Sequence, residues 1–349
     1  MTHLLFFLAV GLWPTAQQVV PERILTLGAR DGSGPAVFGR IRDVELDEEG
    51  TVYVLDDMNL EVRVFALDGA HRGTFGRKGE GPGEFRSLRA IDRAAGDLVV
   101  TETDKLSRFS SDGEFVGSQR VPLVGVVRAL PLQAEDVVVL REGVARRSGI
   151  DGNQVLGIVQ QGSLTEILTG ASPTLFVRAP GEAMALITSL CSSLYLAPLE
   201  GGGFMVGDGR EGLVRLFSSE GAPLANVRVA EKARPLSKDK EEELLRRAEA
   251  SVEARGVRAS QVVIPPYESA ICGLEVESRR RVWVRLARDE EGGEAWTPMD
   301  LETGSLGAPL LLPEGVRAVA FRHGRVAAIG QDEWGVQYVY LYAIPAGGE

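Results

Sequence analysis

Five aspartates are the residues of this sequence with the clearest capacity for chemistry. They stand at or just after short apolar segments, where turns are expected, and they are Asp56, Asp57, Asp104, Asp208 and Asp332. Converging carboxylate oxygens bind calcium, and a bound divalent ion can assist the hydrolysis of an ester or lactone. The same side chains also form turns, because they accept hydrogen bonds from nearby backbone amides. Asp56 and Asp208 each precede a Phe-x-x-acid-Gly sequence by nine residues, so we interpret them as turn residues of a repeat.

A glycine-rich segment, FGRKGEGPGEF at residues 75–85, offers a second kind of chemistry. Glycine loops cradle phosphates when a helix follows directly and aims its first amides at the ligand. Here residues 85–91 alternate in the manner of a strand, and Pro82 has no amide hydrogen to donate. We therefore expect a turn between two strands, with glycines at positive φ, rather than a nucleotide site.

Nucleophilic catalysis has few candidate residues. Beyond the N-terminal segment the histidines are His71 and His323, and a Ser-His-acid set would need one of them. We expect His71 on an outer strand and His323 at a hairpin tip, and the sequence has no Gly-x-Ser-x-Gly elbow. We assign no catalytic residue, and calcium is the one cofactor that the carboxylates leave open.

Charge and hydropathy exclude some partners. The 349-residue chain has a formal net charge of −11, which disfavours binding to nucleic acids and anionic membranes. Residues 4–13 form an apolar run of signal-peptide length, and we expect cleavage after Ala16; a buried N-terminal strand is the alternative. No later stretch is apolar enough to span a bilayer. We expect an exported monomer, periplasmic or extracellular, without membrane insertion once residues 1–16 are removed.

A four-strand module repeats along the chain. Residues 41–76 contain four short strand patterns separated by acid-Gly turns, which is typical of an antiparallel meander. The turn returns as FALDG, FSSDG and FSSEG, and six units fit near 39–76, 85–120, 125–170, 190–230, 267–313 and 316–345. The last unit lacks a fourth strand, which residues 22–29 can supply; this would close a ring and protect its edges. We predict an all-β, six-bladed β-propeller of four-stranded antiparallel blades over residues 22–349.

The first module resembles the NHL repeat of six-bladed propellers. The matching positions are Val52, Val54, Asp56, Asn59, Val64, Phe65, Asp68, Gly69, Phe75, Gly76, Gly81, Gly83 and Phe85. Glu61 departs from the pattern, since that family usually has Arg there, and the match is partial in blades two and four and weak elsewhere. The chain is also similar to exported bacterial propellers of mostly unassigned function. The resemblance implies a central channel and ligand-facing loops, but no reaction.

Two features lie outside the repeat. Residues 236–256 are predicted as a helix that Ser237 caps and Gly256 ends, with an apolar stripe of Leu244, Ala248 and Val252. The helix is either a lid over one mouth of the channel or a solvated excursion. Residues 174–196 are longer than a connection between blades needs, and we expect an extra hairpin there.

The two cysteines, Cys191 and Cys272, also admit two interpretations. Each stands near the first strand of its unit, in neighbouring units, so a disulfide between them is geometrically reasonable in an exported protein. Two buried free thiols are the alternative.

Recognition by loops at one mouth of the channel is the function that we favour. Loops on a rigid scaffold commonly carry binding residues, and the candidates here are Asp56, Asp57, Asn59, Asp208, Arg210 and Trp334. The predicted role is a non-catalytic binding or scaffold module for a protein, peptide or glycan. The alternative is a calcium-dependent lactonase or esterase with its site in the channel.

Overall fold

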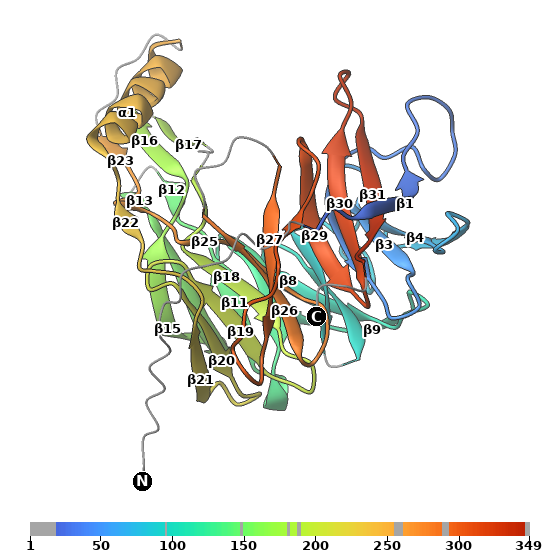
Figure 1. Cartoon of the computed structure of the whole chain (residues 1–349). Coiled ribbons are helices and arrows are strands. Elements are labelled where there is room, and N and C mark those ends of the chain that lie inside the picture. Colours follow the sequence, from blue (N-terminus) through green and yellow to red (C-terminus); the bar gives the residue numbers. More distant parts are fainter. Residues whose placement is uncertain are drawn as a thin grey trace.

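Six four-stranded antiparallel sheets stand in a ring, so the predicted six-bladed β-propeller is confirmed (Figure 1). A computed structural model of the chain describes residues 19–94, 96–146, 149–179, 182–186, 190–254, 261–287 and 293–345. The predicted signal peptide, residues 1–16, lies outside these ranges and stays a prediction. No helix among the described residues is long and apolar enough to cross a membrane.

The first three blades follow one another in chain order. Blade 1 comprises β2 (Ile41–Leu46), β3 (Val52–Asp56), β4 (Glu61–Phe65) and β5 (His71–Phe75). Blade 2 comprises β6 (Ala90–Ala94), β7 (Asp97–Thr101), β8 (Lys105–Phe109) and β9 (Phe115–Arg120). Blade 3 comprises β10 (Val126–Pro131), β11 (Val137–Arg141), β14 (Asn153–Gln160) and β15 (Ser163–Ala171), with the short 3₁₀-helix η1 (Gln133–Glu135) in its first turn.

The last blade takes one strand from the other end of the chain. Blade 4 comprises β18 (Leu194–Pro198), β19 (Phe204–Asp208), β20 (Leu213–Phe217) and β21 (Pro223–Arg228). Blade 5 comprises β25 (Ile271–Val276), β26 (Arg281–Leu286), β27 (Ala295–Asp300) and β28 (Leu310–Leu311). Blade 6 comprises β29 (Val316–Arg322), β30 (Arg325–Gln331), β31 (Gln337–Ala343) and β1 (Glu22–Leu27).

The two ends of the ring carry different loops. We call one end of the ring the upper face. It carries the loops between the second and third strands of each blade and the connections between blades. The lower face is the end that has the other hairpin turns. The upper face points upward in Figure 1.

Hydrophobic clusters fill the junctions between blades. Six clusters of buried residues each join side chains of two neighbouring blades. The Phe of the recurring turn sequence belongs to them, since Phe65, Phe109 and Phe217 are all buried. The repeat pattern in the sequence is therefore the pattern of the contacts between blades.

A hydrogen bond from a backbone amide in or next to each blade's innermost strand also reaches the preceding blade. The six donor and acceptor pairs, in ring order, are Ile41 N to Gln337 Oε1, Ile91 N to Asp43 Oδ2, Ala129 N to Thr101 Oγ1, Leu194 N to Gln154 Oε1, Ala270 N to Gly209 O, and Ala318 N to Glu294 Oε2, at 2.8–3.1 Å. Five of the acceptors are side chains.

The glycine-rich segment forms a turn between blades 1 and 2. Gly76 has a φ of +81°, and the ring of Phe85 packs where a side chain at this position would stand. Glu84 accepts hydrogen bonds from Gly81 N and Arg77 Nε at 2.8 Å, so the turn is held by its own residues. No helix follows, and β6 begins only at Ala90, later than the alternation from residue 85 suggested.

The N-terminal strand closes the ring as predicted. β1 pairs antiparallel with β31, and Leu27 lies opposite Val339. Just before it, Val19 N donates to Pro309 O in blade 5 at 3.0 Å. The start of the described chain therefore joins blade 5 to blade 6.

Insertions stand on the upper face beside blades 3, 4 and 5. They contain β12 (Val144–Arg146), β13 (Gly149–Asp151), the predicted hairpin of β16 (Leu175–Ala179) and β17 (Glu182–Leu186), β22 (Arg234–Pro235), α1 (Lys238–Glu253), β23 (Gln261–Val263) and β24 (Tyr267–Glu268). β23 pairs with β16, so segments before and after blade 4 share one insertion sheet.

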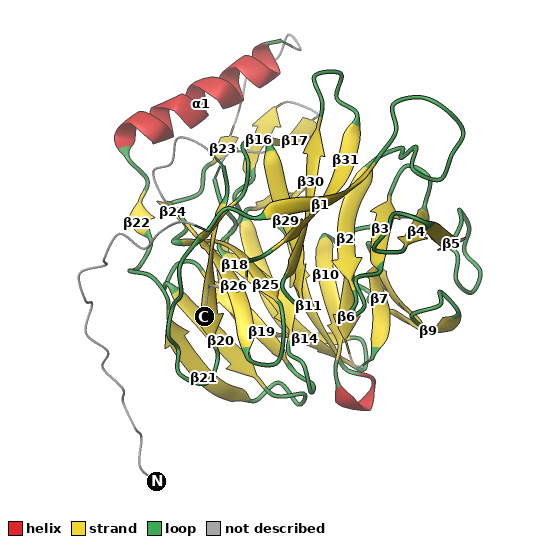
Figure 2. Ribbon diagram, turned by 45° about the vertical axis from the view of Figure 1, so that its right-hand side comes forward, coloured by secondary structure: helices red, strands yellow, loops and turns green. Residues whose placement is uncertain are grey.

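The predicted helix has a packed surface. Ser237 Oγ accepts a hydrogen bond from Lys240 N at 3.3 Å at its start, whereas Gly256 lies outside the described residues. Leu244 and Ala248 pack with Val177 of β16, and Figure 2 shows α1 above β16 and β23. The helix is therefore not a solvated excursion, and the surface that it covers is the insertion sheet.

A disulfide bond joins Cys191 to Cys272, with their Cα atoms 4.9 Å apart. Cys191 lies just before β18 and Cys272 lies in β25, where the two long insertions rejoin the ring. The bond therefore ties the bases of both insertions together.

We expect Leu27→Ala to destabilise the protein much more than Ile24→Ala. Leu27 is buried in the cluster between blades 6 and 1, and removing such a side chain costs about 2–5 kcal/mol. Ile24 lies in the same strand but is 43 % exposed, so its loss should cost only about 0.5 kcal/mol. Denaturant unfolding of both variants checks this, and equal losses would show that β1 does not close the ring.

Removing the disulfide should lower the free energy of unfolding. The bond closes a loop with a sequence separation of 81 residues, for which the loop-entropy model gives about 4–5 kcal/mol before strain. The double variant Cys191→Ala/Cys272→Ala, measured without reductant, should match the reduced wild-type protein. Two reactive thiols in the denatured, unreduced wild type would contradict the bond.

Candidate functional site

The six candidate binding residues all lie at the upper face, but not in one cluster. Asp56, Asp57 and Asn59 belong to the end of β3 and the following loop in blade 1, and Trp334 belongs to the corresponding loop of the neighbouring blade 6. Asp208 and Arg210 lie in blade 4, on the other side of the ring.

The carboxylates of Asp56 and Asp208 accept hydrogen bonds from nearby groups. Asp56 is fully buried, and it accepts hydrogen bonds from Gly39 N and from the side-chain amide of Asn59, both at 2.8 Å. Asp208 accepts from Arg215 Nη2 at 2.7 Å and from Glu211 N at 3.1 Å. Both carboxylates hold the loop that follows them, which is the role expected of a repeat residue.

The other candidate residues differ in exposure. Asp57 forms an ion pair with Arg40, with 2.6 Å between Oδ1 and Nε. The Arg210 guanidinium lies 6.0 Å from the ring centroid of Tyr267. Trp334 is 64 % exposed, and the guanidinium of Arg30 lies over its ring at 4.5 Å. Asp57 is half-buried, whereas Asn59, Arg210 and Trp334 are exposed.

Sequence reasoning missed a group of charged residues in the channel. We call it the channel network, and it consists of Asp43 and Glu45 from β2, Asp92 from β6, Arg128 from β10 and Glu275 from β25. Arg128 Nε donates to Asp92 Oδ1 at 2.8 Å, and its Nη1 lies 3.8 Å from Glu275 Oε1. These strands are the innermost of four blades, so the charges face one another inside the ring.

Burial sets the protonation of the network. It raises the pKa of Asp43 to about 6, of Glu45 to about 7 and of Glu275 to about 8, because removal from water disfavours the charged form. The charge of Arg128 opposes this effect at Asp43 and Glu275. The network therefore holds protons near neutral pH that these acids would lose in water.

An ion pair crosses the lower end of the channel. Arg322, at the end of β29, donates from Nη1 to Glu200, in the turn after β18, and Arg322 is only 6 % exposed. The charge of Arg322 also acts on Glu45 above it. Side chains of blades 4 and 6 thus meet below the network.

Three arginines stand above the network at the upper end. We call them the arginine rim: Arg42, Arg89 and Arg317. Burial lowers the pKa of Arg42, and the nearby charge of Arg89 lowers it further. Arg89 Nε is buried without a hydrogen-bond partner, and none of the three forms an ion pair with a carboxylate of the described residues. The rim is therefore a cationic group with unused donors, which suits an anion.

The carboxylates considered for calcium have other partners. Asp104 pairs with Arg86 at 2.6 Å, and Asp332 accepts hydrogen bonds from Trp334 N and Val336 N. Across the part of the chain that the structure describes, no three His, Cys, Asp or Glu side chains come together as a metal site. The calcium hypothesis thus has no ligand set among these residues.

Together these features define the class of the protein, a six-bladed β-propeller whose channel is filled by charged side chains. Residues 35–141 match the model of a family described as "6-bladed beta-propeller" (DUF5128). No curated protein matches the chain.

Solved structures resemble the chain in fold. A "putative exported protein" of Bacteroides fragilis NCTC 9343 is 12 % identical, with a TM-score of 0.53, over 94 % of this chain and 95 % of the other. A Bacteroides vulgatus member of the duf4221 family is 8 % identical, with a TM-score of 0.47, over 95 % and 97 %. The calcium-binding protein regucalcin of Agrobacterium tumefaciens is 11 % identical, with a TM-score of 0.44, over 95 % and 98 %.

The channel network predicts how stability depends on pH. An acid whose folded pKa is raised stabilises the fold below its unfolded pKa, and that contribution is lost as the pH rises through the folded pKa. Glu275→Gln mimics the protonated acid, so the variant should gain stability relative to wild type as the pH rises from about 5 to about 8. Thermal melts across this range test it, with Glu314→Gln as the exposed control. A parallel pH dependence of wild type and Glu275→Gln would contradict the network.

Proposed function

We propose that this protein is a non-catalytic binding module that takes a carboxylate-bearing peptide segment of another protein at its upper face. The arginine rim is the observation that carries this proposal. Arg42 and Arg89 lie close enough for Arg42 Nε to donate to Arg89 O at 3.4 Å, although both are cationic. A ligand carboxylate would relieve their repulsion and supply an acceptor for the buried Arg89 Nε.

Access to the rim supports the upper face as the binding surface. The Arg322–Glu200 pair crosses the lower end of the channel, and the channel network occupies the interior between the two ends. A ligand that approaches from above would therefore meet the rim first.

Exposed apolar side chains on the upper face favour a peptide over other acids. Met58 in blade 1 is 66 % exposed, and Trp334 in the neighbouring blade 6 is exposed to a similar extent. Exposed aromatic and Met side chains are enriched at protein interfaces. A peptide can place apolar side chains on these residues while its carboxylate binds the arginines.

We also propose that the protein acts outside the cytoplasm, in the periplasm or the extracellular space. The apolar run at residues 4–13 and the NHL-like resemblance support export. The Cys191–Cys272 bond supports it too, because disulfides persist mainly in oxidising compartments.

The test is a peptide array that pairs each acidic peptide with its amidated, uncharged form, with a parallel array of acidic and neutral glycans. We expect acidic peptides to bind the wild type and to lose about tenfold in affinity with Arg42→Gln or Arg89→Gln. Arg120→Gln is the matched control, because Arg120 is an exposed arginine on the outer strand β9.

Three outcomes would count against the proposal. Equal binding of amidated peptides would remove the role of the carboxylate. Equal binding by the rim variants would remove the arginines from the site. Selective binding of acidic glycans would replace the peptide by a different ligand.

A further inference from the structure

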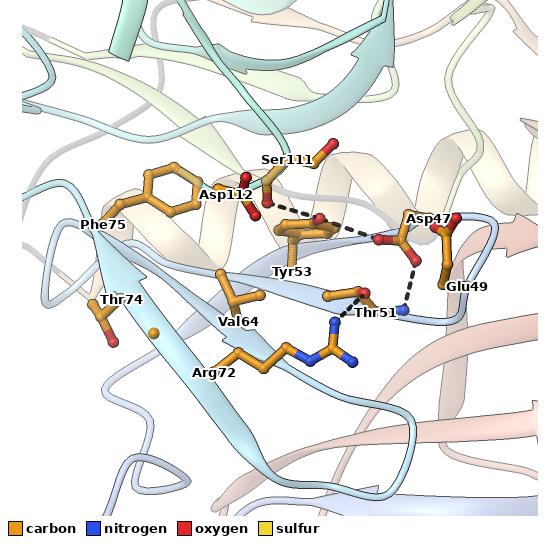
Figure 3. Close-up of a pocket in the computed structure, with 11 residues that line it drawn as sticks. Asp47, Glu49, Thr51, Tyr53, Val64, Arg72, Thr74, Phe75, Ser111 and Asp112 are labelled. Carbon is orange, nitrogen blue, oxygen red and sulfur yellow. Dashed lines mark hydrogen bonds between the residues drawn. The ribbon is translucent and has the colours of Figure 1, made fainter. Parts of the chain in front are cut away.

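A pocket of about 290 Å³ opens between blades 1 and 2, away from the arginine rim (Figure 3). Its walls come from the turn between β2 and β3, from the outer strand β5, and from the turn between β8 and β9. Those turns belong to the lower face, so this pocket and the rim are separate, and an inference about one does not rest on the other.

The buried hydroxyl of Tyr53 lies between two hydrogen-bond acceptors at the wall of the pocket. The Tyr53 hydroxyl lies 3.2 Å from Asp47 Oδ2 and 3.0 Å from the Ser111 carbonyl oxygen, as Figure 3 shows. Burial, and then the charge of Asp47, raise the pKa of Tyr53 to about 12, so the phenol keeps its one hydrogen. One hydrogen cannot serve two acceptors, and Tyr53 is 1 % and Asp47 6 % exposed. When Tyr53 donates to Asp47, the carbonyl of Ser111, an exposed residue, can accept from a ligand.

Charges of both signs surround the pocket. Asp47, Glu49 and Asp112 line it, and none of them has an ion-pair partner among the described residues. Arg72 lines it too and donates from Nη1 to Thr51 Oγ1 at 3.3 Å, and Arg93 lies nearby, since its guanidinium donates to Ser111 Oγ at 3.4 Å.

This mixture of charges favours a neutral ligand that both donates and accepts hydrogen bonds. The arginines disfavour an ammonium group, and the three carboxylates disfavour an anion. A hydroxyl group can donate to the acceptors beside Tyr53 and accept from Arg72. Phe75 and Val64 add an apolar wall for carbon-bound hydrogens.

Gly73 leaves open space in this pocket. It lies in β5 opposite Val64, its φ is not positive, and an added Cβ would meet no atom within 4 Å. The corresponding position is Gly117 in blade 2 and Ala225 in blade 4, and in all three blades it flanks an irregularity in the strand pairing. Ala225 shows that an alanine fits this geometry, so a larger residue at position 73 can be used to fill the pocket.

We propose that the pocket between blades 1 and 2 binds a neutral polyhydroxylated molecule, a sugar or a polyol. Its hydroxyl groups donate to Asp47 and to the Ser111 carbonyl and accept from Arg72. Its carbon-bound hydrogens lie against Phe75.

Saturation-transfer NMR and calorimetry with D-glucose, D-galactose and myo-inositol test this, with cadaverine and acetate as charged probes. We expect at least one neutral probe to bind the wild type at millimolar concentration. Gly73→Leu should weaken this binding by about tenfold by filling the pocket, whereas Gly73→Ala should retain it. Thermal melts verify that both variants fold, and Arg72→Gln, which changes a proposed donor at an exposed position, should likewise weaken binding and replaces Gly73→Leu if that variant does not fold.

Two kinds of result would overturn the proposal. Failure of all three neutral probes to bind, or equal binding by Gly73→Leu and wild type, removes the site. Binding of cadaverine or acetate alone contradicts the neutral class. Arg42→Gln should leave sugar binding unchanged, because the rim lies at the other face.

Discussion

The edge of the innermost strand is the constraint on which this ring depends. Each blade turns one strand edge toward the channel, and its backbone amides there have no neighbouring strand as a partner. At every junction an acceptor from the preceding blade takes one of these amides; Thr101 Oγ1 and Gln154 Oε1 are two of them. Since an unpaired buried amide costs about 1–3 kcal/mol, these bonds add to the stabilisation that the apolar clusters behind them supply.

The same constraint explains why charge gathers inside the ring. A side chain that reaches an inner amide must be polar, and Asp43 does so for Ile91. Once one carboxylate is buried, a cation is needed nearby, and Arg128 supplies it to Asp92 and Glu275. The cation only partly offsets the effect of burial, which raises the pKa of Asp43 and Glu275. The interior is thus polar because the backbone demands acceptors there.

Local sequence signals predicted most of the fold. The acid-Gly turns and the buried Phe residues mark the blades, and the missing fourth strand of the last unit required the N-terminal strand. The channel network was not predicted, because charges in a strand such as residues 41–46 alternate as they would on a solvated sheet. Ring closure decides whether these charged side chains lie in water or face the other blades across the channel. No local sequence pattern encodes ring closure. Asp56, by contrast, was interpreted from its position in the repeat as a turn residue, and its local donors Gly39 and Asn59 agree with that interpretation. Capping residues predicted helix α1, but the surface against which it packs is on β16, which is far from it in the sequence.

The pairing of β1 with β31 has a consequence for the time course of folding. Leu27 meets Val339, so nearly the whole chain must emerge from the ribosome before the first strand finds its partner. Forming such a contact requires closure of a very long loop, and chains with many distant contacts fold slowly. Until then the edge of β31 is open to pairing with other chains. Blades can form one after another during synthesis, but the finished ring is a late, all-or-none event.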